Sequence, residues 1–497
     1  MKKLNDIIEI LKKFSLFIGS NIEDIDIEEI TYDSRNVKNN TLFFCKGLNF
    51  KEEYLLSSKE TGAVCYVSEK KYDVDMPYIL VNDIRIAMME ISRFFYDYPD
   101  RKIKTIGVTG TKGKSTTVMY IKNILDEYLR KNSKKPAGLI SSIDVYDGIS
   151  TIGASLTTPE AIDLYRYIKN AVDSGLEYMI IETSSQALKY YRINNLEFDL
   201  SLFLNIGEDH VSPLEHSSFD DYFDSKLKIF NNSKFAIYNK EIDFVDKVKS
   251  VIKDKNLNYM TFSNDDSSDI SLVEYKFIDD VLDFSVKYEE NVEEYKIHQY
   301  ATYNIENAMA AILTAKYFGI DYESIYKGLI NSEVDGRENI LITNDEKYVL
   351  YVSYAHNELS FQKTYDFIKE RFKNYSIISI YGISGNVAEN RLNGLVKTST
   401  KVSDYIYIVP EDSGYTSYDD ISKKIINKIS PITSNYMKMD DREEAIRYAF
   451  ENSGDKTVIF IAGKGNEDFQ KINGKKIKIK SDYQVAKEII EDYNSRD

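Results

Sequence analysis

The sequence predicts an α/β protein of three domains in series: a small N-terminal α/β domain (1–100), a central domain with a mostly parallel sheet (101–337), and a C-terminal Rossmann-like, doubly wound domain (338–497). Two observations predict this organisation. At 497 residues the chain is longer than one hydrophobic core supports, so several domains of roughly 150 residues are expected. Short apolar runs also alternate with helix-length amphipathic segments, as in parallel sheets.

The first hundred residues predict short strands and helices. Residues 1–20 carry charges within an apolar stretch, which predicts an amphipathic helix and not a signal peptide. The apolar runs at 41–44 and 63–67 predict strands, and residues 84–96 predict a helix. The turn-forming residues 98–101 follow that helix, so we place the first domain boundary there.

The rest of the chain repeats strand and helix. In the central domain, strands are expected at residues 103–108, 178–181 and 200–204, separated by longer helical stretches. After Gly336, helix-length amphipathic segments follow a further series of apolar runs, at 348–352, 377–380, 405–409 and 458–461. This second series predicts the doubly wound C-terminal domain.

Composition excludes several classes of protein. The formal net charge of -16 argues against nucleic-acid binding, which depends on Lys and Arg neutralising phosphates. Two cysteines, Cys45 and Cys65, are too few for a disulfide framework and match no zinc motif. No apolar run is long enough to span a membrane. We therefore expect a cytoplasmic protein, a monomer, that binds neither nucleic acid nor membranes.

The strongest motif is a phosphate loop, Gly107-Val108-Thr109-Gly110-Thr111-Lys112-Gly113-Lys114-Ser115-Thr116, between a predicted strand and a predicted helix. Glycines let backbone N–H groups approach phosphates, and the helix N-terminus adds partial positive charge. Lys114 is placed to reach the terminal phosphates, and Ser115 to ligate Mg²⁺. The motif predicts ATP binding by residues 110–116; the alternative is a glycine-rich turn that binds nothing.

The loop departs from the usual pattern in having its first glycine at 107, with valine at 108. This form, Gly-x-x-Gly-Thr-x-Gly-Lys-Ser-Thr, resembles that of Mur ligases and folylpolyglutamate synthetases. Other segments resemble successive signatures of the Mur ligases that make UDP-N-acetylmuramoyl-tripeptide, closest to the lysine-adding type. These segments are Tyr32-Asp33-Ser34-Arg35, Leu156-Thr157-Thr158-Pro159-Glu160, Glu182-Thr183-Ser184-Ser185-Gln186-Ala187, Asn205-Ile206, Asp209-His210, 222–226, 304–307, Gly336-Arg337-Glu338, Tyr354-Ala355-His356-Asn357 and Ala462-Gly463-Lys464-Gly465.

The resemblance implies a role for residues in every domain. Contacts to UDP-muramoyl-dipeptide are implied for Ser34, Thr157, Thr158, Ser184 and Arg192. Asn304 and Arg337 resemble contacts to ATP. The incoming amino acid is expected in the C-terminal domain, with Arg391 clamping its carboxylate while Gly463 and Glu467 hold its polar end.

The resemblance also implies a catalytic Mg²⁺ site made of Ser115, Glu182, His210 and Lys226. Lys226 matches a lysine that the family carbamylates to N6-carboxylysine, and Lys114, Lys226 and His210 are the expected catalytic residues. Without the resemblance, Glu182 and Lys226 would be expected to be solvated side chains; for Arg391, a surface arginine on a helix is the alternative to the carboxylate clamp.

The implied activity is ATP-dependent ligation of an amino acid, L-lysine first, to the D-glutamate side-chain carboxylate of UDP-N-acetylmuramoyl-L-alanyl-D-glutamate, through an acyl phosphate. Two segments differ from the family pattern where the incoming amino acid is expected to bind. Ser353 stands where the family has aspartate, and residues 411–415 replace the family's usual motif for the amino-acid pocket. Three alternatives stay open: diaminopimelate as the amino acid, because Glu467 resembles that type; a degenerate paralogue that senses UDP-muropeptides or ATP; and a ligase for a folate or a peptide natural product.

Overall fold

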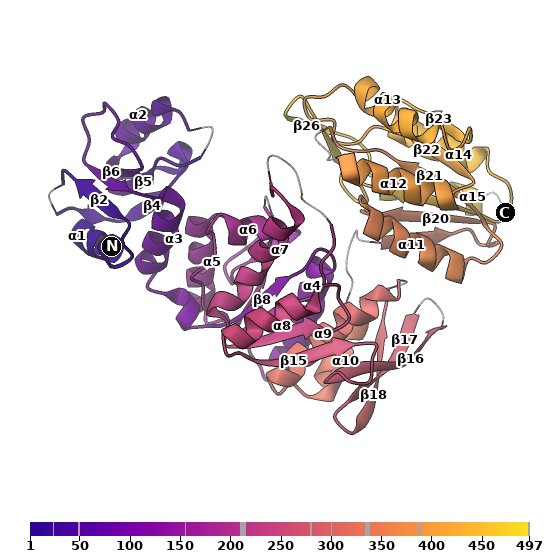
Figure 1. Cartoon of the computed structure of the whole chain (residues 1–497), viewed down its shortest axis with the longest axis horizontal. Coiled ribbons are helices and arrows are strands. Elements are labelled where there is room, and N and C mark those ends of the chain that lie inside the picture. Colours follow the sequence, from indigo (N-terminus) through magenta and orange to yellow (C-terminus); the bar gives the residue numbers. More distant parts are fainter. Residues whose placement is uncertain are drawn as a thin grey trace.

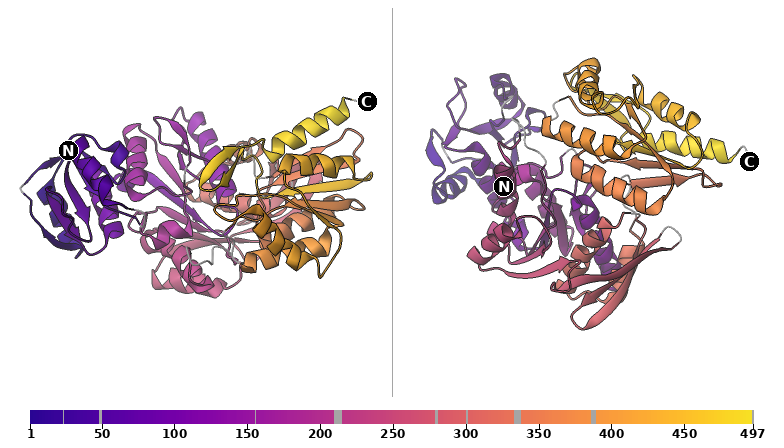
Figure 2. Two further views of the ribbon diagram at one scale, coloured as in Figure 1. Left: turned by 90° about the horizontal axis from the view of Figure 1, so that it is seen from above. Right: turned by 45° about the vertical axis from the view of Figure 1, so that its right-hand side comes forward.

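The computed structural model describes residues 1–22, 24–47, 50–154, 156–208, 215–278, 281–299, 301–332, 338–385 and 389–495. Within these ranges the strands form three large sheets and two small two-stranded ones. The N-terminal and C-terminal sheets lie at opposite ends of an elongated molecule, with the central sheet between them (Figures 1 and 2). No helix in the described ranges combines the length and apolar content that crossing a bilayer takes.

The N-terminal sheet has the strand order β2-β7-β6-β5-β4. The four strands β4 to β7 run parallel and β2 pairs antiparallel to β7 at the edge. The elements are β1 (Lys2–Lys3), α1 (Leu4–Lys13), β2 (Phe17–Ser20), β3 (Asp26–Ile27), β4 (Glu29–Thr31), β5 (Thr41–Phe44), α2 (Glu52–Thr61), β6 (Ala63–Ser68), β7 (Tyr78–Val81) and α3 (Ile84–Phe95). Helix α3 packs on α5 of the next sheet, so one hydrophobic core runs through both.

The central sheet is larger than the sequence predicted, with eleven strands in the order β11-β10-β9-β12-β8-β13-β14-β15-β16-β17-β18. The seven neighbouring strands β9-β12-β8-β13-β14-β15-β16 run parallel, and antiparallel strands extend both edges, β10 and β11 at one and β17 and β18 at the other. The elements are β8 (Lys104–Thr109), α4 (Lys114–Lys131), β9 (Gly138–Ile140), β10 (Asp144–Tyr146), β11 (Thr151–Gly153), α5 (Ala161–Asp173), β12 (Tyr178–Glu182), α6 (Ser185–Lys189), β13 (Leu200–Phe203), α7 (Phe219–Leu227), β14 (Phe235–Asn239), α8 (Val245–Asp254), β15 (Asn258–Ser263), β16 (Ile270–Ile278), β17 (Val281–Tyr288), β18 (Asn291–Ile297), α9 (Tyr303–Tyr317) and α10 (Tyr322–Ile330).

The register of the three central strands places functional groups at one edge. In β12, Glu182 pairs with Val108 of β8, and in β13, Phe203 pairs with Thr109. Because the three strands are parallel, their carboxyl ends meet, and the phosphate loop after β8 emerges beside Glu182. In open parallel sheets, ligands bind at such carboxyl ends.

The C-terminal sheet has the order β19-β20-β24-β21-β22-β23, parallel except for β19. Helices cover both of its faces, with separate cores around Phe361 and Ile446. The elements are β19 (Glu338–Ile342), β20 (Tyr348–Ser353), α11 (Glu358–Arg371), β21 (Ser376–Tyr381), α12 (Glu389–Val402), β22 (Tyr405–Ile408), α13 (Tyr418–Ile429), β23 (Tyr436–Lys438), α14 (Arg442–Glu451), β24 (Thr457–Ala462), β25 (Phe469–Ile472), β26 (Lys475–Lys478) and α15 (Asp482–Asn494).

The predicted fold class is confirmed: the protein is α/β, with a mostly parallel central sheet and a doubly wound C-terminal sheet. Every strand named in the sequence prediction is present, with ends shifted by at most a residue. The antiparallel ribbon β16–β18 was not foreseen. The domain boundaries at 100 and 337 remain a prediction, since sheets alone do not fix where one folding unit ends.

Candidate active site

The phosphate loop leads from β8 into α4 with the geometry of an anion site. Gly113, at the helix N-terminus, has φ +81°, which glycine adopts without strain. The Lys114 ammonium folds back and donates to the carbonyl oxygens of Gly110 at 3.1 Å and Thr111 at 3.2 Å. The Asn205 side chain bonds both the N–H and the carbonyl of Lys112, at 2.8 and 3.0 Å, and so braces the loop from β13.

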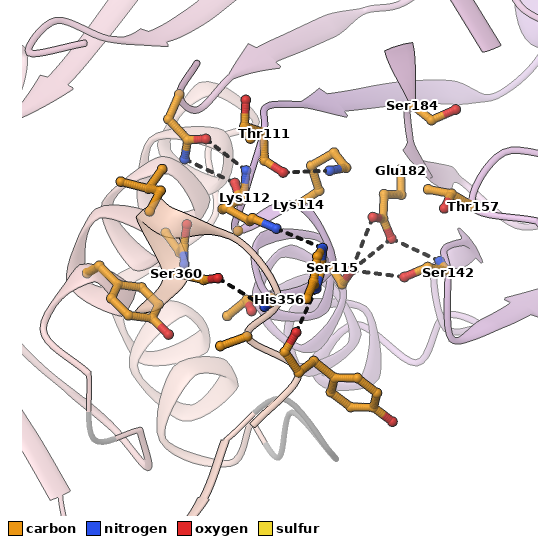
Figure 3. A pocket seen from close by; sticks show the side chains of 18 of the residues that line it. Thr111, Lys112, Lys114, Ser115, Ser142, Thr157, Glu182, Ser184, His356 and Ser360 are labelled. Atoms are coloured by element: carbon orange, nitrogen blue, oxygen red, sulfur yellow. Dashed lines mark hydrogen bonds between the residues drawn. The ribbon is translucent and has the colours of Figure 1, made fainter. Parts of the chain in front are cut away.

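Two of the predicted Mg²⁺ ligands lie side by side behind this loop. The Ser115 hydroxyl is 3.1 Å from both carboxylate oxygens of Glu182 (Figure 3). Ser142 completes the group, because its N–H donates to Glu182 at 2.9 Å and its hydroxyl lies 3.0 Å from that of Ser115. Glu182 is only 2% exposed, so the expectation that it would be a solvated glutamate is wrong. The register of β12 carries it into the cleft instead.

Lys226 on α7 is buried as well, at 2% exposure, and the expectation of a solvated helix residue is wrong for it too. Its ammonium donates to the Gly110 carbonyl at 2.7 Å and lies over the Tyr222 ring. Tyr222 in turn donates to the Thr111 hydroxyl at 3.0 Å. Helix α7 therefore presents Lys226 directly to the phosphate loop.

Among the residues that the structure describes, no three His, Cys, Asp or Glu side chains cluster to hold a metal by themselves. Mg²⁺ bound beside nucleotide phosphates needs only one or two protein oxygens, because phosphates and water supply the rest. The Ser115 hydroxyl and Glu182 carboxylate fit that requirement. His210 and Arg337 lie outside the described residues.

The cleft around the loop has a volume of about 440 Å³ and is lined from two sheets. Thr157, Ser184 and Arg192 line it, as does Asn304 of α9. Thr158 does not: it is fully buried, and its hydroxyl donates to the Glu182 carbonyl at 2.8 Å and accepts from the Ser184 N–H at 3.0 Å. Thr158 therefore supports the carboxyl end of β12.

Asn304 sits close to the phosphate loop through its neighbour on α9. The Asn307 amide donates to the Asn304 side-chain oxygen at 3.0 Å. A Cβ on Gly113 would lie 2.2 Å from the Asn307 oxygen. A larger residue at 113 would therefore displace the Asn307 side chain, in addition to the strain of the backbone conformation.

The C-terminal domain closes the other side of the cleft. The ring of His356 uses Nδ1 to bond the Tyr354 carbonyl at 2.7 Å, and because a carbonyl only accepts, Nδ1 carries the proton. Nε2 is then the acceptor for the Lys112 ammonium at 3.2 Å, a contact between the two domains (Figure 3). His356 also lines a second cavity of about 200 Å³, so the two cavities adjoin.

This second cavity contains the three predicted amino-acid contacts, Arg391, Gly463 and Glu467. Arg391 is half-buried and lines this cavity, and its role as a carboxylate clamp stays a prediction. The sequence prediction assigned no binding role to three charged residues that line the cavity, Glu411, Asp412 and Lys464. Lys464 is 2% exposed and pairs with Asp412 at 2.9 Å and with Glu467.

Glu411 also lines this cavity. Burial raises its pKa to about 7, and the nearby cations Arg442 and Lys464 oppose the shift. Arg442 is itself buried and bonded to Asp482 at 2.6 Å. The cavity thus presents a carboxyl group that titrates near neutral pH.

Ser34 lies away from these two cavities, in a third of about 600 Å³ on the N-terminal domain. The aromatic rings of Phe50 and Tyr54 line it together with Lys46 and Arg35. Aromatic rings are suited to stacking on a flat base. The sequence prediction did not include Lys46, because a lone lysine after a strand carries no pattern.

Several other residues escaped the prediction although they stood inside or beside recognised segments. They share a bracing role at the carboxyl ends of strands or beside the loop, and are Ser142, Asn205, Tyr222, Asn307 and His356. Asn205, Tyr222, Asn307 and His356 fall within segments that carried the family resemblance. Their place within these segments was the signal that could have identified them from the sequence.

Comparison with known proteins gives a consistent result. The family model described as Mur ligase middle domain matches residues 108–315, and that of the Mur ligase, glutamate ligase domain matches 336–465. A UDP-N-acetylmuramyl-tripeptide synthetase of Lactobacillus delbrueckii subsp. bulgaricus is 34% identical over 514 residues, covering 98% of this chain and 99% of the relative.

A UDP-N-acetylmuramoyl-L-alanyl-D-glutamate--L-lysine ligase of Enterococcus faecalis is also 34% identical, over 502 residues that cover 98% of this chain and 97% of the relative. Among solved structures, the MurF ligase of Thermotoga maritima in complex with ADP superposes with a TM-score of 0.63 at 16% identity, covering 94% of this chain and 98% of that one. At that identity the likeness is one of fold.

Proposed function

Because the chain belongs to the Mur ligase family, we propose that it is an ATP-dependent ligase that adds L-lysine to UDP-N-acetylmuramoyl-L-alanyl-D-glutamate, a step in making peptidoglycan precursors. The observation that carries the proposal is the junction at His356. There the cleft containing the phosphate loop meets the charged cavity containing Arg391. A nucleotide and an amino acid bound in these cavities would share one reaction centre, in the cytoplasm where ATP is available.

The phosphate loop supplies the activation step. We assign ATP phosphates to the N-terminus of α4, where Lys114 exchanges its two carbonyl contacts for phosphate oxygens. The γ-phosphoryl group passes to the side-chain carboxylate of D-glutamate, which gives an acyl phosphate and ADP. Lys114 stabilises the negative charge that spreads over the transferred group.

The amino-acid cavity supplies the second step. Arg391 holds the α-carboxylate of the incoming amino acid, which directs its amine towards the acyl carbon. The amine attacks, a tetrahedral intermediate forms, and inorganic phosphate leaves as the amide is made. The Lys112 contact with His356 holds the two domains together and limits the entry of water that would hydrolyse the acyl phosphate.

We propose Ser115, Glu182, His210 and carbamylated Lys226 as the residues that hold Mg²⁺. When bound, the ion neutralises charge on the phosphates. A carbamate on Lys226 keeps one N–H, which is enough to retain the bond to the Gly110 carbonyl while its carboxylate faces the cleft. The position of Lys226, buried and bonded to the phosphate loop, supports this assignment.

The charge of the second cavity favours lysine over diaminopimelate. Glu411, Asp412 and Glu467 line it against Arg391 and Lys464, which leaves one net negative charge when Glu411 is ionised. Lysine brings one net positive charge. Diaminopimelate has a second carboxylate and would need another available cation, yet Lys464 is bonded to Asp412 and Glu467.

One observation favours the alternative of a sensor that binds without turnover. Ser353, where the family has aspartate, lines the cleft at 4% exposure, and its hydroxyl accepts from the Ala355 N–H at 3.1 Å. The serine therefore supports the turn that carries His356 but brings no charge to the cleft.

The test is phosphate release by the purified protein with ATP, Mg²⁺ and UDP-N-acetylmuramoyl-L-alanyl-D-glutamate, against a panel of amino acids. Release that depends on L-lysine supports the proposal, and release with diaminopimelate alone would change the amino acid. Binding of substrate with no release for any amino acid would establish the sensor. Release without the muramoyl dipeptide, on a folate or peptide acceptor, would refute the substrate assignment.

A further inference from the structure

A fully buried histidine lies between the two elements that carry the proposed metal ligands. His216, at 0% exposure, stands two residues before the N-cap of α7, the helix of Lys226. Its Nε2 is 3.0 Å from the hydroxyl oxygen of Ser185. Ser185 begins α6 and follows Glu182, at the end of β12, by three residues. A single contact thus links the segment after Glu182 to the segment before Lys226.

The histidine ring also touches the side chain that connects α7 to the phosphate loop. The rings of His216 and Tyr222 meet edge to face, with centroids 5.2 Å apart and an angle of 72° between their planes. Tyr222 lies one helical turn before Lys226, whose ammonium stands over the tyrosine ring. The Tyr222 hydroxyl donates to Thr111 of the loop at 3.0 Å. The position of Lys226 against the loop therefore depends on where His216 holds Tyr222.

Other polar contacts fasten α6 to α7 independently of the histidine. Lys189 of α6 donates to the Asp221 carboxylate of α7 at 2.6 Å and to the Glu215 carbonyl at 2.8 Å. The Gln186 amide donates to the Glu215 carboxylate at 3.0 Å. Because these bonds remain when residue 216 is replaced, a variant there should keep both helices. It should alter mainly the fit of the ring between its two neighbours.

We propose that His216 is a positioning residue for the metal site, which spaces Lys226 from Glu182 so that both can hold one Mg²⁺. The inference rests on the proposed function for the identity of that site. His216 contacts neither ligand itself, since it acts through Ser185 on one side and Tyr222 on the other. Residues that hold metal ligands in place without touching the metal typically contribute about 10- to 100-fold in metal affinity or activity.

Two substitutions separate the contacts of His216 from one another. His216→Gln carries an amide that reaches Ser185 but has no ring, and His216→Phe keeps a ring against Tyr222 but has no group to bond Ser185. Metal binding is measured apart from turnover. Mn²⁺ replaces Mg²⁺ and is titrated, with detection by electron paramagnetic resonance, into full-length protein saturated with a non-hydrolysable ATP analogue. Thr314→Ala is the matched control, since it removes a fully buried hydroxyl from α9, which packs on the same sheet.

Each of the two substitutions should weaken Mn²⁺ binding about 10-fold, and His216→Ala, which removes both contacts, about 100-fold. The affinity for the ATP analogue without metal should stay at the wild-type value. In protein that carries Lys226→Ala, His216→Ala should have little further effect, because it acts through Lys226. In the ligase assay, the His216 variants should raise the Mg²⁺ concentration that gives half-maximal rate and leave KM for the amino acid near wild type.

The affinity for the ATP analogue without metal reports whether each variant is folded. An unchanged Mn²⁺ affinity in all three His216 variants would overturn the positioning role. So would an equal loss in Thr314→Ala, or an undiminished effect of His216→Ala in protein that already carries Lys226→Ala. Wild type that binds Mn²⁺ more tightly than the variants but releases no phosphate with any amino acid would support the positioning role and count against the proposed function instead.

Discussion

Gly113→Ala gives the sharpest test of the phosphate loop, because two separate features of the structure should each lower the free energy of ATP binding in this variant. The residue has φ +81°, which costs an L-amino acid about 1 kcal/mol. The new Cβ would also lie 2.2 Å from the Asn307 oxygen. Asn307 must move, and its bond to Asn304 at 3.0 Å is worth about 1 kcal/mol.

The variant loop can avoid both costs in the free protein by adopting another conformation. ATP binding must then restore the original one, so the affinity for ATP should fall by about 2 kcal/mol, roughly 30-fold. Titration calorimetry with a non-hydrolysable ATP analogue measures this directly. In protein that already carries Asn307→Ala the clash is absent. There, Gly113→Ala should lower the affinity for ATP only about fivefold, the part that comes from the backbone conformation.

Gly175→Ala is the matched control. Gly175 has φ +75° but no atom within 4 Å of an added Cβ, and it lies in the turn after α5. This variant should lose stability without losing affinity for ATP. An ATP affinity of Gly113→Ala within threefold of wild type, or no recovery on adding Asn307→Ala, would refute the explanation from contact and conformation.

Three further predictions concern the other groups of the site. Lys226→Ala should abolish turnover, with partial recovery by added short carboxylic acids that replace the carbamate; a full rate without them would remove Lys226 from the metal site. Because the pKa of Glu411 is raised to about 7, its carboxylate forms as pH rises through 7. The negative charge attracts lysine, so KM for lysine should fall over that range in wild type. An equally steep fall in Glu411→Gln would exclude Glu411 as the cause. Asp482→Ala leaves Arg442 buried without its carboxylate and should destabilise the C-terminal domain by about 3–5 kcal/mol in urea unfolding; a change below about 1 kcal/mol would show that the pair is solvated.

Strand positions were predictable because local chemistry determines them. The runs that became β8, β12 and β24 are apolar and rich in β-branched residues, and they are almost wholly buried in the structure. The ribbon β16–β18 was missed because it is half exposed and rich in charged residues, so it lacks an apolar run. Its strands are stabilised by pairing with one another.

Burial of charged residues was not predictable in the same way. From the sequence alone, a glutamate and a lysine are expected to be solvated side chains. Only the parallel register of β8 and β12 places Glu182 beside the phosphate loop. Lys226 reaches the same loop because α7 packs beside it. The amino-acid cavity depends on segments far apart in the chain, since Asp412 and Lys464 meet only where β22 and β24 end.

The sequence by itself determined the phosphate loop, the α/β class and the family, because each depends on residue types at fixed spacing along the chain. The tertiary structure alone decided which charges are buried together. It placed Ser115 against Glu182 and Lys112 against His356. It also placed Lys46 and Arg192 on either side of the Glu160 carboxylate. The physical reason is that burial and Coulomb interaction depend on distance in space, and parallel strands and packed domains bring together residues that no sequence spacing connects.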